Sequence, residues 1–133
     1  MNCSMIFKAE LILEGNTYLL NSLTFQLNQA IDKFGRPSSI TKGGKIKIEL
    51  FTVEDDVIFD WMVHPRKTLN GNINLYEADN ETKFKEMKFE NAYCIEYFEI
   101  FDQSISESMV TKLIVSAEKL SIGTIELDNQ WLK

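Results

Sequence analysis

Residues 86–97 read EMKFENAYCIEY, and this stretch decides the fold class. Apolar side chains occupy five of its six odd positions, and charged side chains occupy four of its six even positions. Successive side chains of a strand point to opposite faces, so the pattern predicts one long strand with a dry and a wet face. After Tyr97 the phase flips, because Phe98 and Ile100 become the apolar pair. The flip predicts a bulge or sharp bend near Tyr97, of the kind that lets a sheet curl into a barrel.

The rest of the chain adds about five further strands and one helix. Glu14-Gly15-Asn16 and Asn70-Gly71 are typical turn sequences, and residues 79–82 form a third polar turn. In the second strand, one face is expected to carry Leu19, Leu23, Phe25 and Leu27. The further strands are expected at residues 5–13, 19–28, 45–50, 73–76 and 109–117, with a closing tail after Gly123.

Residues 54–63 change to a helical period. Val57, Ile58, Trp61 and Met62 fall on one helix face, acidic residues precede them, and Pro65 ends the segment. About six strands and one helix predict a small, mainly β, antiparallel barrel of two curled sheets with a short helix on its side. At 133 residues, the chain is expected to be one domain spanning residues 1–133.

Composition excludes several classes of function. The net charge of −6, from 14 basic and 20 acidic residues, disfavours a nucleic-acid binder and docking to an anionic membrane. No stretch approaches the ~20 apolar residues that span a bilayer, and the N-terminus lacks the features of a cleaved signal peptide. We therefore expect a protein kept in the cytoplasm, or one that leaves without a cleaved signal. Cys3 and Cys94 are too few for a disulfide framework.

No catalytic, metal or cofactor site is expected. His64, the single histidine, stands at a predicted helix end without a partner for catalysis or metal binding, so a contact with that helix end is the favoured role. Cys94, on the wet side of the long strand, is expected to be a small packing residue. Gly43-Gly44 lacks a phosphate-loop pattern and is expected to let a loop turn into the next strand. One histidine and no nucleophile motif leave an enzyme without a mechanism.

Residues 30–44 interrupt the strand pattern with a long polar loop. A loop of this length without internal structure is uncommon in a compact domain and is often functional. Arg36 with Lys42, and residues 64–67, form small basic spots in an acidic protein. These spots either serve solubility or meet acidic patches on another copy of the chain.

Five blocks of sequence, in their order and spacing, resemble the Hcp (TssD) tube protein of type VI secretion systems in its Bacteroidetes form. The resemblance spans roughly residues 7–131. The blocks are residues 34–39 (FGRPSS), 42–44 (KGG), 59–65 (FDWMVHP), 71–73 (GNI) and 85–95 (KEMKFENAYCI).

The resemblance implies a small β-barrel that forms hexameric rings with a wide channel. The rings would stack into an inner tube that a contractile sheath drives into a target cell behind a spike, with effector proteins carried in the lumen. It implies no catalytic site. The loop from residues 32–44 would reach a neighbouring ring or subunit, with Arg36, Pro37, Ser38, Ser39, Thr41 and Lys42 in the stacking contact. The polar strand faces, including Glu86, Lys88, Glu90 and Glu96, would either line the channel or meet neighbouring subunits. The resemblance leaves both roles open.

An alternative is a monomeric barrel that binds a small ligand or a peptide. Such a module needs a partly hollow interior. The chain has 15 aromatic residues, nine Phe, four Tyr and two Trp, which suffice to fill a small barrel. The tube subunit is therefore the favoured interpretation.

Overall fold

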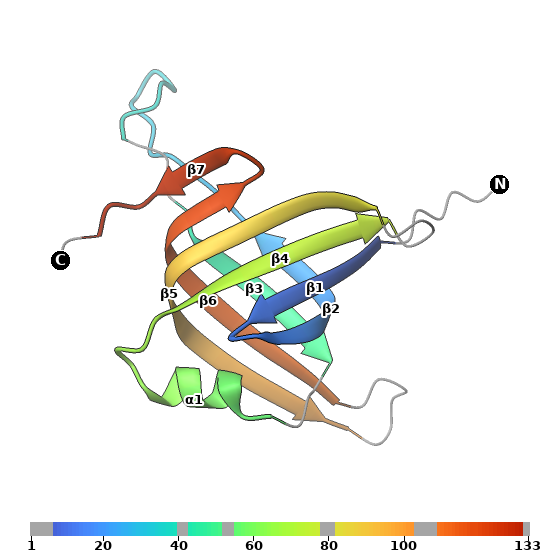
Figure 1. Ribbon diagram of the computed structural model, residues 1–133. Coiled ribbons are helices and arrows are strands. Elements are labelled where there is room, and N and C mark those ends of the chain that lie inside the picture. The colour runs from blue at the N-terminus through green and yellow to red at the C-terminus, as the bar shows by residue number, and fades with distance from the viewer. Residues whose placement is uncertain (1–6, 40–42, 52–54, 78–81, 103–108, 132–133) are drawn as a thin grey trace.

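The computed structural model describes residues 7–39, 43–51, 55–77, 82–102 and 109–131. These residues form seven strands and one short helix (Figure 1). The strands are β1 (Phe7–Leu13), β2 (Asn16–Phe25), β3 (Lys45–Phe51), β4 (Leu69–Glu77), β5 (Lys83–Phe101), β6 (Met109–Ile122) and β7 (Ile125–Asp128). The helix α1 (Val57–Val63) lies between β3 and β4 in the chain.

All neighbouring strands are antiparallel, and the sheet closes on itself. The order is β3-β2-β1-β4-β5-β6-β7, and a further pairing of β3 with β6 closes six strands into a barrel. The short β7 extends the sheet beyond β6 as a hairpin. The predicted fold class, a small antiparallel barrel with one helix, is confirmed.

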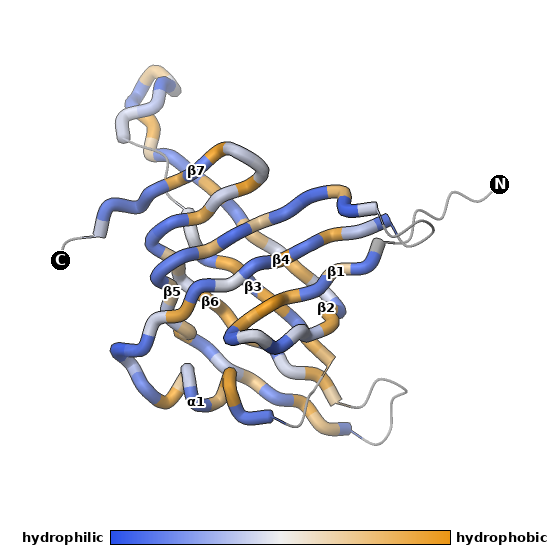
Figure 2. Tube along the Cα trace, in the orientation of Figure 1, coloured by the Kyte–Doolittle hydropathy of each residue, from blue (hydrophilic) through white to orange (hydrophobic). Residues whose placement is uncertain are grey.

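The barrel interior is filled by side chains. Trp61 of α1 lies parallel to the ring of Phe89, with 6.4 Å between ring centroids. Along the strands apolar residues repeatedly alternate with polar ones (Figure 2), as expected for an inner and an outer face. The largest fully buried side chains are Trp61, Tyr18, Phe89, Leu11, Leu13, Ile46, Ile48, Leu50, Ile73, Met87, Leu113 and Val115.

The long strand β5 changes phase earlier than its sequence predicts. Met87 and Phe89 face the core as expected, but the next buried residues are Ala92 and Cys94. Asn91 has a left-handed backbone, with φ of 55°, which rotates the strand between the two pairs. A register shift against β6 follows between Cys94 and Glu96. The predicted bulge exists, and Tyr97 packs against the core as expected, but the predicted dry face is wrong at Tyr93 and Ile95.

Three side chains of β5 consequently face the other way. Tyr93 is only partly buried and Ile95 is 40% exposed, although both were expected on the dry face. Cys94, expected on the wet side, is 7% exposed and packs in the core. Burial raises the pKa of its thiol to about 11, which keeps it protonated and unreactive.

The face predicted for β2 is also partly wrong. Tyr18 and Leu20 point into the barrel, whereas Leu19 and Leu27 are exposed. A register shift against β3 between Leu20 and Ser22 brings the partly buried Leu23 and Phe25 back onto the core. A single alternating pattern cannot describe a strand that contains such an irregularity.

Of the two turns predicted at glycine residues, the structure contains one. Glu14 and Gly15 have positive φ values of 53° and 78° and close the β1–β2 hairpin, as predicted. The turn predicted at Asn70-Gly71 is wrong, because both residues lie within β4. Gly71 instead makes room for Phe89, since a Cβ there would lie 2.2 Å from the ring atom Cζ.

Some expectations fall outside the described residues. They concern Met5 in the first strand, Cys3, Glu54 before the helix, residues 79–81 of the polar turn and residues 103–108 between the last two long strands.

Candidate assembly surfaces

Two strand edges lack a strand neighbour in the described part of the chain. β2 pairs with β1 through residues 16–19 only, so its residues 20–25 have β3 on one side and no strand on the other. β5 pairs with β4 through residues 83–92 only, so its residues 93–101 have β6 as their single strand neighbour. Between these edges lie four strands in the order β2-β3-β6-β5. Unpaired edges of this kind are templates for pairing with another chain.

The outer face of these four strands forms a shallow trough lined by both polar and apolar side chains, with a hollow of about 620 Å³. One row across it runs from Thr24 through Lys47 and Ile114 to Glu96. In the next row, Lys112 Nζ lies 3.5 Å from Glu49 Oε2, a partly exposed pair that contributes little to stability. Glu96, a predicted lumen or neighbour-facing residue, lies on this trough.

Glu86, Lys88 and Glu90 lie on the other half of β5, before the turn of the strand at Asn91. Glu86 Oε2 accepts a hydrogen bond of 2.9 Å from Asn72 Nδ2 on β4. This bond, followed in importance by nearby lysines, lowers the pKa of Glu86. The four predicted residues thus belong to two surfaces, because Asn91 and the Cys94–Glu96 irregularity rotate β5 between them.

The connection from β2 to β3 projects from one end of the barrel (Figure 1). Contrary to expectation, it has internal structure, since Ile31 and Pro37 form an antiparallel bridge. The carboxylate of Asp32 organises the tip. Its Oδ1 accepts bonds from the amides of Phe34 (2.9 Å) and Arg36 (3.0 Å), and its Oδ2 accepts one from Arg36 Nε (3.1 Å). These bonds, the Arg36 amide first, lower the pKa of Asp32.

The tip presents an aromatic ring with two cations near its face. Phe34 is 71% exposed, with Lys33 Nζ 5.3 Å and Arg36 Cζ 5.1 Å from its centroid. The predicted contact residues Arg36, Pro37, Ser38 and Ser39 are all exposed on this loop. Ser39 Oγ also accepts a bond of 3.1 Å from the amide of Ala30. Thr41 and Lys42 lie outside the described residues.

Asn129, after β7, fixes the base of this loop. Its Oδ1 accepts a bond from the Gly43 amide at 3.2 Å, and its Nδ2 donates to the carbonyl oxygens of Gly43 (2.7 Å) and Ala117 (3.1 Å). Gly44 has a φ of 103°, so the glycines turn the loop into β3 as expected. Sequence analysis missed Asn129 because its partners lie 12 and 86 residues away.

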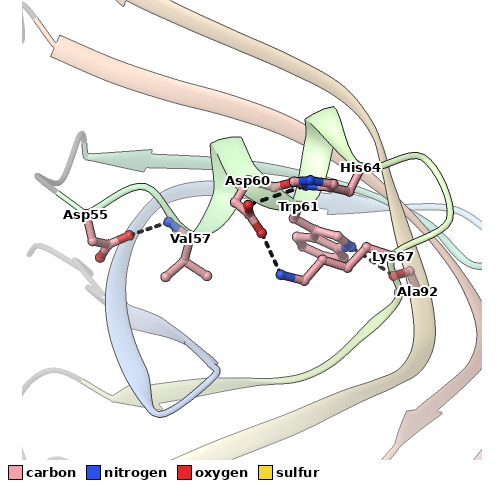
Figure 3. A network of polar contacts seen from close by, with 7 residues as sticks. All are labelled: Asp55, Val57, Asp60, Trp61, His64, Lys67 and Ala92. Carbon is pink, nitrogen blue, oxygen red and sulfur yellow. Dashed lines mark hydrogen bonds and ion pairs between the residues drawn. The ribbon is translucent and has the colours of Figure 1, made fainter.

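Hydrogen bonds join the helix α1 to the barrel on either side of its first turn, and Figure 3 shows the one between Trp61 and Ala92. Asp55 Oδ1 accepts bonds from the Val57 amide (3.1 Å) and the Tyr18 hydroxyl (3.0 Å). Trp61 Nε1 donates to the carbonyl of Ala92 on β5 at 3.1 Å. His64 Nδ1 lies 2.8 Å from the Asp60 carbonyl oxygen, which confirms the helix-end role predicted for this histidine.

The exposed Phe59 of this helix meets the partly buried Tyr97 of β5, a contact that sequence analysis did not predict. Phe59 is 54% exposed and contacts the ring of Tyr97 edge-on at 5.7 Å. The Tyr97 hydroxyl donates to Glu99 Oε1 at 3.1 Å, and burial followed by this bond raises the pKa of Tyr97 to about 12. Phe101, at the end of β5, is 64% exposed.

Across the described residues, no group of three or more His, Cys, Asp or Glu side chains is placed to hold a metal ion. Within the same residues, no helix is long and apolar enough to cross a membrane.

Comparisons with known proteins agree with this geometry. The family model described as hemolysin coregulated protein Hcp (TssD) matches residues 5–132. No curated protein sequence matches the chain. Hcp1 from Flavobacterium johnsoniae is 32% identical, with a TM-score of 0.86, and the match covers 92% of this chain and 99% of that one.

Two more distant structures share the fold. Hcp1 from Salmonella typhimurium is 10% identical with a TM-score of 0.76, over 93% of this chain and 95% of that one. The sheath/tube terminator of an extracellular contractile injection system, PVC, is 12% identical with a TM-score of 0.61, over 93% and 99% of the two chains. From its family match and its close structural relative, this chain belongs to the Hcp (TssD) family, the tube-forming structural proteins of type VI secretion systems.

Proposed function

We propose that the chain forms closed six-membered rings, which stack into the inner tube of a type VI secretion system. Family membership supplies the tube role. One observation supports the ring: the four strands β2-β3-β6-β5 are bounded by two different unpaired edges, residues 20–25 of β2 and 93–101 of β5. In the proposed ring, the β2 edge of one copy pairs with the β5 edge of the next.

This arrangement needs two unlike patches on each subunit, which is the condition for a ring that closes head to tail. It also covers both edges, which would otherwise invite uncontrolled aggregation. The outer face that carries Thr24, Lys47, Ile114 and Glu96 then lines the channel. Glu86, Lys88 and Glu90 lie on the β4 side of the barrel, away from the channel.

The extended loop is proposed to make the contact between stacked rings. Arg36, Pro37, Ser38 and Ser39 are exposed on a loop that projects beyond the barrel, and Thr41 and Lys42 belong to the same connection in sequence. The bonds of Asp32 hold the tip in one shape, which reduces the entropy lost on contact.

Further partners follow from the tube role. We expect the tube to meet a spike protein, a sheath and baseplate components, and to carry effector proteins in its lumen. The subunit is expected in the cytoplasm before firing and outside the cell afterwards.

A monomeric binding module is not favoured. Such a module needs a hollow interior. Here Trp61 and Phe89 stack inside the barrel, and the hollow of about 620 Å³ lies on the face that carries the exposed Thr24 and Lys47.

Light scattering on the purified chain, with negative-stain imaging of the same fraction, tests the proposal. A ring of six 15.4 kDa subunits has a mass of about 92 kDa. We expect that mass together with ring-shaped particles. A variant whose loop 30–38 is shortened serves as control, because it should keep the ring and lose the tube. A 15.4 kDa monomer at concentrations up to hundreds of micromolar would contradict the proposal.

A further inference from the structure

We infer that the residues after β7 couple the stacking of rings to the closure of each ring. We call these residues, 129–131, the C-terminal strap. This inference rests on the proposed function and adds a physical link between the loop that stacks and the strand edge that closes the ring. One end of the strap is bonded to the base of the loop, and its other end packs on the first residue of the β5 edge.

Asn129 joins the strap to the base of the extended loop. Its side chain accepts a bond from the Gly43 amide at 3.2 Å and donates one to the Gly43 carbonyl oxygen at 2.7 Å. A third bond, from the same Nδ2 to the Ala117 carbonyl oxygen at 3.1 Å, ties this junction to β6. Gly43 is also closely packed, because a Cβ there would lie 3.1 Å from the Leu127 side chain. A displaced loop base therefore breaks the bonds that hold the strap.

Trp131 joins the strap to the β5 edge. Its ring stacks on the ring of Tyr93, with 5.5 Å between centroids and 27° between planes. Tyr93 is the first residue of the segment 93–101, which has β6 as its single strand neighbour. Gln130 has a left-handed backbone, with φ of 56°, and its amide donates to Asp128 Oδ1 at 2.8 Å. This turn directs the chain from β7 over β6 to β5.

Between its two ends the strap is bonded to β6, beside the turn of β5 at Asn91. The Asn129 amide donates to the Glu118 carbonyl oxygen at 2.8 Å. The Glu118 carboxylate, on a residue only 6% exposed, accepts a bond of 2.7 Å from the Asn91 side chain. The loop base, β6 and the turn of β5 are therefore connected by one chain of contacts.

The strap can be docked or released without opening the barrel, because residues 129–131 are not part of the buried core. Ordering the strap costs conformational entropy once, so a contact that orders one end lowers the cost at the other end. Stacking that holds the loop base should therefore favour a docked Trp131 and a β5 edge that is ready to pair. Edge pairing should favour stacking by the same factor, since coupling between two binding events is reciprocal.

Hydrogen exchange at the Gly43 amide reports the strap from its far end. Trp131→Ala removes the stacking on Tyr93 and leaves Asn129 in place, so this amide should exchange about tenfold faster in dissociated subunits. Trp131→Phe can still stack on Tyr93 and should restore most of the protection. Phe98→Ala is the matched control, because Phe98 is a 58% exposed ring on the same edge, opposite Lys112. Unchanged exchange in Trp131→Ala, or an equal increase in Phe98→Ala, would overturn the inference.

Effects that cross from one surface to the other measure the coupling itself. Trp131→Ala should raise the concentration at which rings stack by about tenfold, although Trp131 packs on the β5 edge. Asn129→Ala should raise the concentration at which rings half-dissociate, although Asn129 holds the loop base. The double variant should stack no worse than Trp131→Ala, because both changes release one strap.

Stacking losses that multiply to about a hundredfold in the double variant would show two independent contacts and contradict the coupling. An Asn129→Ala ring that dissociates like the unaltered ring would contradict it as well. Light scattering separates these failures from failure of the proposed function. In the former the unaltered chain still forms rings of about 92 kDa, and in the latter it forms none.

Discussion

The side-chain amide of Asn91 donates a 2.7 Å hydrogen bond to the carboxylate of Glu118, where β5 and β6 turn together. On β5 the buried apolar residues step from Phe89 to Ala92, and on β6 they step from Ala117 to Leu120, with the carboxylate-bearing Glu118 also buried between them. Each strand therefore changes phase at this pair. Because both strands rotate at one place, their pairing register continues unchanged across it. The pair forms a corner of the barrel.

Replacing Asn91 should separate the contribution of its hydrogen bond from the contribution of its left-handed backbone to the stability of this corner. Asn91→Ala removes the bond to Glu118 and places an alanine at φ of 55°, so we expect a loss of about 1–3 kcal/mol in the free energy of unfolding. Asn91→Gly also loses the bond but relieves the backbone, and should cost less. Urea denaturation measures both. Glu90→Gln, an exposed neighbour, is the control, and equal stability of the Ala and Gly variants would contradict a strained corner.

This corner also explains how far the sequence could predict the fold. Alternation predicted β3 and the first half of β5 correctly, because those residues follow an unbroken strand geometry. It failed from Asn91 to Ile95 because one left-handed residue moves the side chains that follow it to the other face, until the register shift between Cys94 and Glu96 returns Tyr97 to the core side. The turn prediction at Gly71 failed for a related reason. In sequence, a glycine that makes room for the Phe89 ring looks the same as a turn glycine.

Gly44 should tolerate no side chain. Its φ is 103°, and a Cβ would lie 2.5 Å from the Ala117 carbonyl oxygen. Gly44→Ala should therefore reduce the free energy of unfolding by about 2–4 kcal/mol. Gly15→Ala is a matched control, since Gly15 also has a positive φ but meets nothing within 4 Å, so only about 1 kcal/mol is expected. Equal losses in the two variants would show that the close approach to Ala117 has no effect.

Asn129 should matter for assembly more than for folding. Asn129→Ala frees Gly43 from the C-terminal tail, but leaves the core residues untouched. We expect a loss of about 1–2 kcal/mol in unfolding free energy, intact rings and fewer tubes. Hydrogen exchange at the Gly43 amide, with tube length by electron microscopy, measures the effect. Asn16→Ala removes one exposed local bond and serves as control. Undiminished tubes with a freely exchanging Gly43 amide would contradict this role.

Stacking should weaken at acid pH through Asp32. The folded loop tip lowers the pKa of Asp32 from its ordinary 3.8. The stabilisation it provides is complete above that value and is lost as the pH falls through the lower folded pKa. We expect Asp32→Asn at pH 7 to loosen the tip as acid does in the unaltered chain. Exchange of the Phe34 and Arg36 amides reports this change, and an Asp32→Asn variant whose amides stay protected would refute it.

The candidate surfaces were less predictable than the strands. The loop was found from its composition, yet its Asp32-centred structure depends on bonds that no pattern of hydrophobicity encodes. The unpaired edges of β2 and β5 follow from how far each partner strand extends, which is a property of the closed barrel. Glu86 and Glu96 belong to one stretch of sequence and lie on different surfaces, because the strand turns between them.

Hydrogen exchange at the two strand edges tests the ring most directly. Amide exchange is compared between assembled rings and dissociated subunits, for residues 20–25 of β2 and 93–101 of β5. Edge pairing predicts that outward-facing amides on both segments become protected in the ring, while amides of the central strands β3 and β6 change little. Rings of about 92 kDa in which neither edge gains protection would contradict the account.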